Sequence, residues 1–128
     1  MSATDTSVQT ALETIDNWGK WYVLTADQAI VPTQGYIADK VGLLTLTLPA
    51  TSTVGQMFWV TNINTAAGWL IAQNANQSIK MGSLDTTIGV GGSLAATALG
   101  DSIQCVCTVA GASTRWQVIS SVGNITLV

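Results

Sequence analysis

The sequence predicts an all-β protein with one compact antiparallel domain, shaped as a sandwich, barrel or prism. Two observations support this fold class. Short segments that alternate apolar and polar residues recur along most of the chain. Clusters of Gly, Pro, Asn and Ser separate them at intervals of about eight to twelve residues, as in sandwiches and barrels. The length of 128 residues fits a single domain with a core of its own.

The first part of the chain has a different, helical periodicity. Asp5, Thr6 and Ser7 suit a helix start, and Gly19 suits its end. We expect a short helix over residues 7–17, or an extended arm that orders on docking. We expect residues 1–30 to form an attachment or oligomerisation segment and residues 31–128 to form the β-rich domain. The apolar side chains expected to anchor the segment recur at helical spacing: Val8, Leu12, Ile15 and Trp18.

Strand periodicity begins after Gly19. The segment 43–48 alternates clearly, with Leu44, Leu46 and Leu48 on one face. The segment 56–62 is apolar on both faces, which indicates a central or covered strand. The other strands expected in this half cover residues 21–25, 29–32 and 35–37.

The second half of the chain predicts two hairpins. Segments 69–73 and 77–81 flank the turn residues 74–76, and segments 102–109 and 114–120 flank the turn at 111–113. The stretch between the hairpins is rich in Gly, Ser, Thr and Ala. Two further strand segments are expected, at 86–90 and 125–128.

Low charge predicts self-association. Charged residues make up 9% of the chain, hydrophobic residues make up 48%, and the mean hydropathy is +0.41. A small monomer exposes much surface and needs charge to remain in solution. We therefore expect part of the apolar surface to be buried against other subunits.

The charge pattern argues against nucleic acid and membrane partners. The four basic residues are Lys20, Lys40, Lys80 and Arg115, which are far apart in sequence, whereas nucleic-acid binding needs clusters. The chain has neither a run of about 18 apolar residues nor a signal-peptide pattern. We expect synthesis in a cytoplasm, with any surface location reached by assembly.

The sequence does not predict an enzyme, a cofactor or a metal. Histidine, the commonest general base and metal ligand, is absent. The carboxylates stand mostly beside turn residues, where they cap turns. Strand pairing could bring Asp85 and Asp101 together, but no pattern indicates it. Cys105 and Cys107 are expected to be small buried hydrophobes, because their i, i+2 spacing is unfavourable for a disulfide.

Five tryptophans are many for this length. Trp59 and Trp116 lie in alternating apolar segments and are expected in the core. Trp21, Tyr22 and Trp69 lie close to loops and are the candidates for surface contact. Packing in the core or at a subunit interface is the favoured role of the tryptophans, and stacking on sugars stays open.

Residues 68–79 carry the most distinctive stretch of the chain, GWLIAQNANQSI. It resembles the GW-x-IAQNA-x-Q-x-I element of bacteriophage tail-fibre and virion-surface domains. GGSL at 91–94, DSIQCVCTV at 101–109 and WQVISSVGNITLV at 116–128 are similar to the rest of that domain. The resemblance covers residues 43–128. It implies a β-rich fold, frequent homotrimers and a place on the virion exterior, and it carries no catalytic residue.

The expected function is therefore that of a virion-surface structural protein. Family examples are often modules of long fibres, whereas this short chain begins with Met, which favours a stand-alone virion protein: a short fibre, a tail appendage or a capsid decoration protein. Multivalent binding to a host-surface glycan or receptor would attach the particle. The alternatives are a capsid decoration or cement protein without host binding, and a self-assembling extracellular filament subunit. The expected partners are further copies of the chain and other virion proteins.

Overall fold

A computed structural model of the chain describes residues 19–64 and 68–128. These residues form twelve strands and no helix, so the all-β prediction is confirmed for them. The helix expected over residues 7–17 lies outside the described residues. In chain order the strands are β1 (Trp21–Leu24), β2 (Gln28–Ala29), β3 (Gly35–Ala38), β4 (Leu44–Thr47), β5 (Met57–Asn62), β6 (Trp69–Ala72), β7 (Ser78–Met81), β8 (Leu84–Asp85), β9 (Ser93–Ala96), β10 (Ser102–Val109), β11 (Arg115–Val122) and β12 (Ile125–Leu127).

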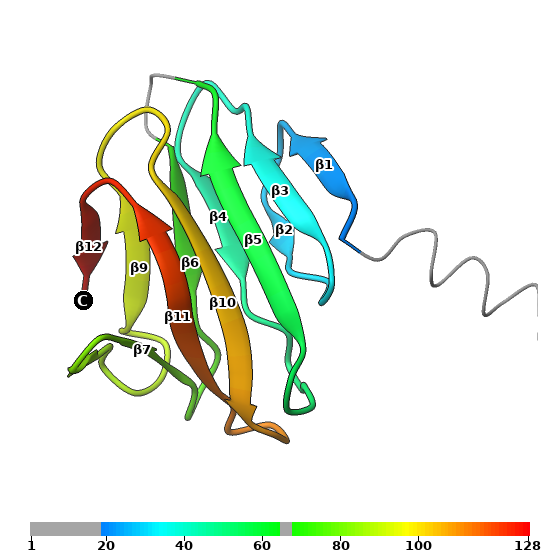
Figure 1. The fold of residues 1–128 in the computed structure, drawn as a ribbon, viewed down its shortest axis with the longest axis vertical. Coiled ribbons are helices and arrows are strands. Elements are labelled where there is room, and N and C mark those ends of the chain that lie inside the picture. Colours follow the sequence, from blue (N-terminus) through cyan, green and yellow to red (C-terminus); the bar gives the residue numbers. More distant parts are fainter. Residues whose placement is uncertain (1–18, 65–67) are drawn as a thin grey trace, which may run out of the picture.

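Two sheets face each other in a sandwich (Figure 1). Sheet A has seven strands in the order β1-β3-β5-β10-β11-β7-β8, and sheet B has five in the order β12-β9-β6-β4-β2. The prediction of antiparallel sheets is wrong, because both sheets are mixed. Five of the ten described strand pairs are parallel.

The parallel pairs arise because the first six strands form a flattened coil. Successive strands lie alternately in sheet A and sheet B, so β1, β3 and β5 pair in parallel, as do β2, β4 and β6. A parallel pair needs a long crossover connection. Here each crossover is itself a strand of the opposite sheet. The coil also makes β1 and β2 parts of the sandwich, which therefore begins at Trp21 rather than at residue 31.

The core lies between the sheets and is built from alternate residues of each strand. The expected alternation in β4 is confirmed, because Leu44, Leu46 and Leu48 are fully buried. β5 lies between β3 and β10, which confirms its central position. The ring of Phe58 on β5 packs against that of Trp116 on β11, with centroids 5.1 Å apart and planes tilted by 59°. Such tilted aromatic pairs add to the stabilisation that burial provides.

Of the two expected hairpins, one is confirmed and one is wrong. β10 and β11 pair antiparallel across the 111–113 turn. β6 and β7 do not pair, because β6 belongs to sheet B and β7 to sheet A. Residues 86–90 do not form the expected strand. A two-residue strand, β8, lies just before them instead. The strand β9 at Ser93–Ala96 was not predicted.

The crossing from β6 to β7 is held by buried amide side chains. Gln73 Nε2 lies 2.9 Å from each of three carbonyl oxygens, those of Gln77, Thr87 and Gly89. Gln77 Nε2 donates to the carbonyl of Pro49 at 2.8 Å, and Gln77 Oε1 accepts from the backbone N–H of Asn74 at 2.8 Å. Both glutamines are buried. They therefore tie the crossing to the 86–92 loop and to the end of β4, and much of the distinctive 68–79 stretch serves the fold.

Candidate functional site

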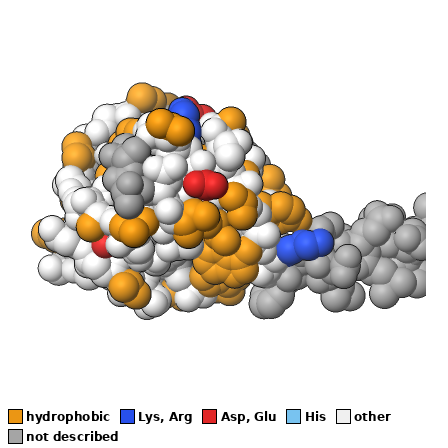
Figure 2. Space-filling model, turned by 90° about the horizontal axis from the view of Figure 1, so that it is seen from above, with side chains coloured by type: hydrophobic (Ala, Val, Ile, Leu, Met, Phe, Trp, Pro, Cys, Tyr) orange, Lys and Arg blue, Asp and Glu red, His pale blue; other side chains and the backbone are white. Residues whose placement is uncertain are grey.

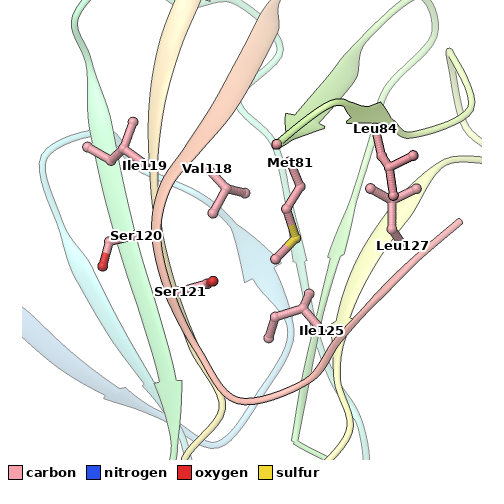
Figure 3. Close-up of a pocket in the computed structure, with 9 residues that line it drawn as sticks. Met81, Leu84, Val118, Ile119, Ser120, Ser121, Ile125 and Leu127 are labelled. Carbon is pink, nitrogen blue, oxygen red and sulfur yellow. The ribbon is translucent and has the colours of Figure 1, made fainter.

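A hollow with a largely apolar lining lies between the sheets at the β8–β12 edge (Figure 3). Its volume is about 500 Å³. Met81 extends from the end of β7 toward Ile125 of β12 (Figure 3). The apolar lining residues come from four strands: Met81, Leu84, Val118, Ile119, Ile125 and Leu127. We refer to this hollow, together with Gly82, Ser120 and Ser121 at its rim, as the edge slot.

The edge slot is open because its walls are short. β8 has two residues and β12 has three, so neither extends along the full length of β11. A β-bulge in β11 adds to the opening, since Gln104 pairs with Ser120 but Cys105 pairs with Val118. Ile119 is the extra residue and is exposed, and Leu84 is 62% exposed. An exposed hollow of this kind is typical of a binding or assembly surface rather than of a finished core.

The surface-contact candidates from the sequence lie in three different environments. Trp21 is 47% exposed on the outer face of β1, whereas Tyr22 is partly buried and packs against the core. The prediction for Trp69 as a surface contact is wrong. Its side chain is fully buried in sheet B and its Nε1 donates to the carbonyl of Asp101 at 2.8 Å. The anchor candidates Val8, Leu12, Ile15 and Trp18 lie outside the described residues.

Of the two tryptophans that were expected in the core, Trp116 lies there and Trp59 does not. Trp116 is fully buried, which confirms the expected core position. Trp59 is only partly buried. It lies on the outer face of β5, because its neighbours Phe58 and Val60 are the residues that face the core. The sequence could not distinguish the two faces of β5, since both are apolar.

The described carboxylates with shifted pKa values act within the fold. Asp101 is buried and its Oδ2 accepts from the backbone N–H groups of Thr97 and Ala98, at 2.9 and 3.0 Å. These hydrogen bonds, with that of Thr97 first, hold the pKa of Asp101 below its ordinary value although burial opposes them. Asp85 is elsewhere, at the surface of β8, where it pairs with Lys80 at 3.4 Å.

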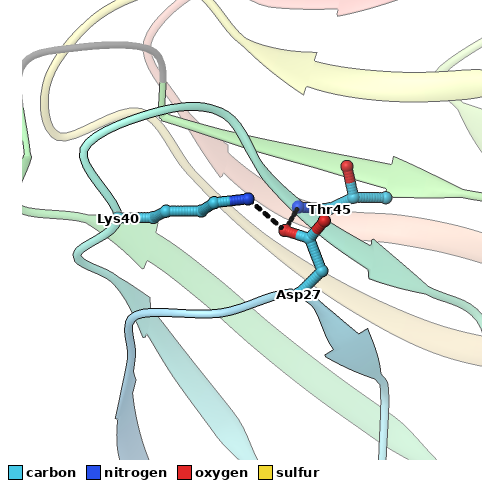
Figure 4. A network of polar contacts seen from close by, with 3 residues as sticks. All are labelled: Asp27, Lys40 and Thr45. Carbon is cyan, nitrogen blue, oxygen red and sulfur yellow. Dashed lines mark hydrogen bonds and ion pairs between the residues drawn. The ribbon is translucent and has the colours of Figure 1, made fainter.

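Asp27 fastens the start of β2 to the neighbouring strand (Figure 4). Its Oδ1 accepts from the backbone N–H of Thr45 at 2.9 Å and from Lys40 Nζ at 3.1 Å. The Thr45 hydrogen bond, followed by that of Lys40, lowers the pKa of Asp27. The group is exposed, so this network is a surface clamp of modest strength.

The two cysteines are buried and free, which confirms the prediction for them. Burial raises the pKa of both thiols, and Cys107 Sγ also donates to the carbonyl of Val109 at 3.3 Å. Thiols with raised pKa values are poor nucleophiles at neutral pH.

Within residues 19–64 and 68–128, no group of three or more His, Cys, Asp or Glu side chains could hold a metal ion. The same residues contain no helix that is long and apolar enough to cross a membrane.

Comparison with known proteins adds no relative: no family model matches the chain, and no curated protein is similar to it in sequence.

Proposed function

We propose that the chain is a non-catalytic structural subunit of the exterior of a bacteriophage particle, a short tail fibre or appendage that self-associates as a homotrimer. The observation that carries this proposal is the edge slot. A hollow of about 500 Å³ with an apolar lining is open to solvent at one lateral edge of the sandwich. Filling it with a second copy would remove Leu84 and Ile119 from water, which is favourable in proportion to the area buried.

The rest of the surface supports self-association. Fifteen large hydrophobic side chains are exposed among the described residues, in a chain with four basic and seven acidic residues. Figure 2 shows orange hydrophobic side chains scattered among white polar side chains and backbone on one face, with few charged groups between them. Oligomers use such apolar surface at their interfaces. The resemblance of residues 43–128 to virion-surface domains supports the location.

The shape of the slot constrains the symmetry. A concave surface cannot pair with an identical concave surface, so the slot must receive a different part of the neighbouring copy. Such a contact closes into a ring when the rotation between copies allows it, and otherwise continues into a filament. A contact of this kind is compatible with a closed homotrimer and also with a filament subunit.

Light scattering after size exclusion tests the proposal. The wild-type chain is expected at about three times 13.3 kDa. Leu84→Asp places a charge in the slot and is expected to shift the chain to monomer, because burying an unpaired carboxylate is costly. Val41→Asp is the matched control, since Val41 is 84% exposed and lies outside the slot.

Each alternative gives a different result. A wild-type monomer contradicts self-association and favours a decoration protein that orders on its particle. Open-ended wild-type polymers favour a filament subunit. Assembly that persists in Leu84→Asp, or that is lost equally in both aspartate variants, would contradict the assignment of the slot as the specific interface. Mass spectrometry of the purified bacteriophage particles tests the virion location. Absence of this chain's peptides from the particles would contradict that location.

A further inference from the structure

One row of residues crosses the outer face of sheet A and includes two tryptophans. The strand register places five residues side by side in the order Trp21, Gly35, Trp59, Gln104 and Ser120. They come from β1, β3, β5, β10 and β11. The middle position between the tryptophans is a glycine, so no side chain separates them.

Gly35 allows the indole of Trp21 to lie over the strand. A Cβ at position 35 would lie 2.5 to 2.8 Å from three atoms of the six-membered ring of Trp21. The ring therefore covers the glycine with one face, while 47% of the side chain stays exposed. A fixed indole with one free face is a stacking platform, and little conformational entropy is lost when a ligand binds to it.

A shallow pocket of about 130 Å³ lies beside this row. None of the nine residues that line it is charged. Ser102 Oγ donates to Thr61 Oγ1 at 2.7 Å. Gln104 Nε2 donates to Met57 Sδ at 3.7 Å, a weak acceptor that leaves most of the amide's hydrogen-bonding capacity available. The side chains that face the pocket from the outer surface are Trp21, Trp59, Ser102, Gln104, Ser120 and Val122.

We propose that this pocket binds a sugar ring of a neutral glycan. A pyranose presents an apolar C–H face that stacks on an aromatic ring and a rim of hydroxyl groups that pair with amides and serines. The lining supplies both kinds of contact, and the absence of a charged group gives no preference for an anionic ligand. The volume accommodates about one sugar ring, so the remainder of the glycan extends into solvent.

The inference rests on the proposed function, because one shallow sugar site is weak. A dissociation constant near 1 mM corresponds to about 4 kcal/mol of binding, which a small open pocket can supply. Self-association repeats the site, so several weak contacts to one glycan-coated surface act together. The pocket and the edge slot share Ser120 and Ser121, but Trp21 belongs to the pocket alone and Leu84 to the slot alone. The two sites can therefore be altered separately.

The test is a titration of the full chain with neutral tetrasaccharides of glucose, mannose and N-acetylglucosamine, followed by tryptophan fluorescence and ligand-observed NMR. At least one of them is expected to bind at millimolar concentration. Trp21→Ala is expected to weaken binding at least tenfold. Gly35→Ala, which displaces the Trp21 ring without removing it, is expected to weaken binding severalfold. Val23→Ala, an exposed change on the same strand outside the pocket, is expected to have no effect.

Light scattering on the same samples separates this inference from the proposed function. A wild-type chain that assembles but binds none of the three tetrasaccharides overturns the sugar site and leaves the assembly standing. A chain that binds a tetrasaccharide but stays monomeric overturns the assembly and leaves the site standing. Equal binding by wild type and Trp21→Ala overturns the assignment of the site. Tighter binding of a sialylated or sulfated sugar than of its neutral counterpart overturns the neutral ligand class.

Discussion

At the scale of single residues, two buried amides determine how the chain passes from one sheet to the other. Gln73 and Gln77 donate to carbonyl groups that lie in the crossing, in the 86–92 loop and at the end of β4. A buried carbonyl without a donor is costly. The conformation of three separate backbone segments therefore depends on two side chains.

Replacing Gln73 by Ala is expected to lower the free energy of unfolding by about 3 kcal/mol, since each buried acceptor left unpaired costs about 1–3 kcal/mol. Urea unfolding followed by tryptophan fluorescence measures the change. Gln28→Ala is the control, because Gln28 is exposed and its amide lies 3.4 Å from the carbonyl of Ala29, its neighbour in the chain. Equal stabilities of the two variants would show that the Gln73 hydrogen bonds contribute nothing net.

Asp101 makes the stability of the fold depend on pH in the acidic range. Its pKa is lowered in the folded chain by the hydrogen bonds from Thr97 and Ala98. A lowered folded pKa contributes stability above the unfolded value of about 3.9, and this contribution is lost as the pH falls through the folded pKa. Asp101→Asn removes the titrating group and leaves an acceptor oxygen in place.

The wild-type chain is therefore expected to lose more thermal stability between pH 7 and pH 2.5 than Asp101→Asn does. At pH 7 the variant should have the lower Tm, and at pH 2.5 the two should converge. Asp27, whose pKa is also lowered, titrates in both proteins, so the difference isolates Asp101. Circular dichroism melts at the two pH values measure it, and parallel losses in both proteins would contradict the role.

At the scale of elements, the strands that alternate clearly could be predicted and their partners could not. Leu44, Leu46 and Leu48 share a buried face, as their period of two requires. The turn at residues 74–76 is rich in Asn, and Asn76 has a φ of 67°. That geometry suits a hairpin and also suits this crossing. Local turn chemistry does not encode which sheet the next strand joins. The hydrogen bonds that hold this crossing run from Gln73 and Gln77 to carbonyls in other segments of the chain.

The two candidate surfaces could not be predicted from the sequence, because each is assembled from several strands. The edge slot is built from β7, β8, β11 and β12. The row of residues from Trp21 to Ser120 on the outer face of sheet A comes from five strands. Their residues become neighbours only through strand order and register. The exposure of Trp21 agrees with its position near a loop. The same criterion fails for Trp69, which is buried and donates to the carbonyl of Asp101.

The turn between β11 and β12 should tolerate no side chain at Gly123. This residue has a φ of 90°, and a Cβ there would lie 1.8 Å from Asp101 Oδ1. Gly123→Ala is expected to lower the free energy of unfolding by about 2 kcal/mol, since a left-handed conformation alone costs about 1–2 kcal/mol. Gly42→Ala is the matched control, because a Cβ at Gly42 meets no atom within 4 Å. Equal urea midpoints would contradict the close packing of this turn on Asp101.

At the scale of the whole molecule, the two candidate surfaces lie on opposite sides of one strand. β11 separates the edge slot, between the sheets, from the proposed sugar pocket on the outer face of sheet A, and Ser120 and Ser121 border both. If copies associate through the slot as proposed, the Trp21 side of the pocket would face outward. One sandwich can in this way combine an assembly surface with an attachment surface.

The flattened coil of β1 to β6 has a consequence for how such a chain can change in length. Each turn of the coil adds one strand to each sheet and repeats the contacts of the turn before it. Among the described strands, β1 and β2 each pair on one side only. An inserted turn could pair there without altering the core, the slot or the pocket, much as solenoid proteins gain repeats. The architecture is therefore modular at this edge, and related chains could differ in width while keeping both surfaces intact.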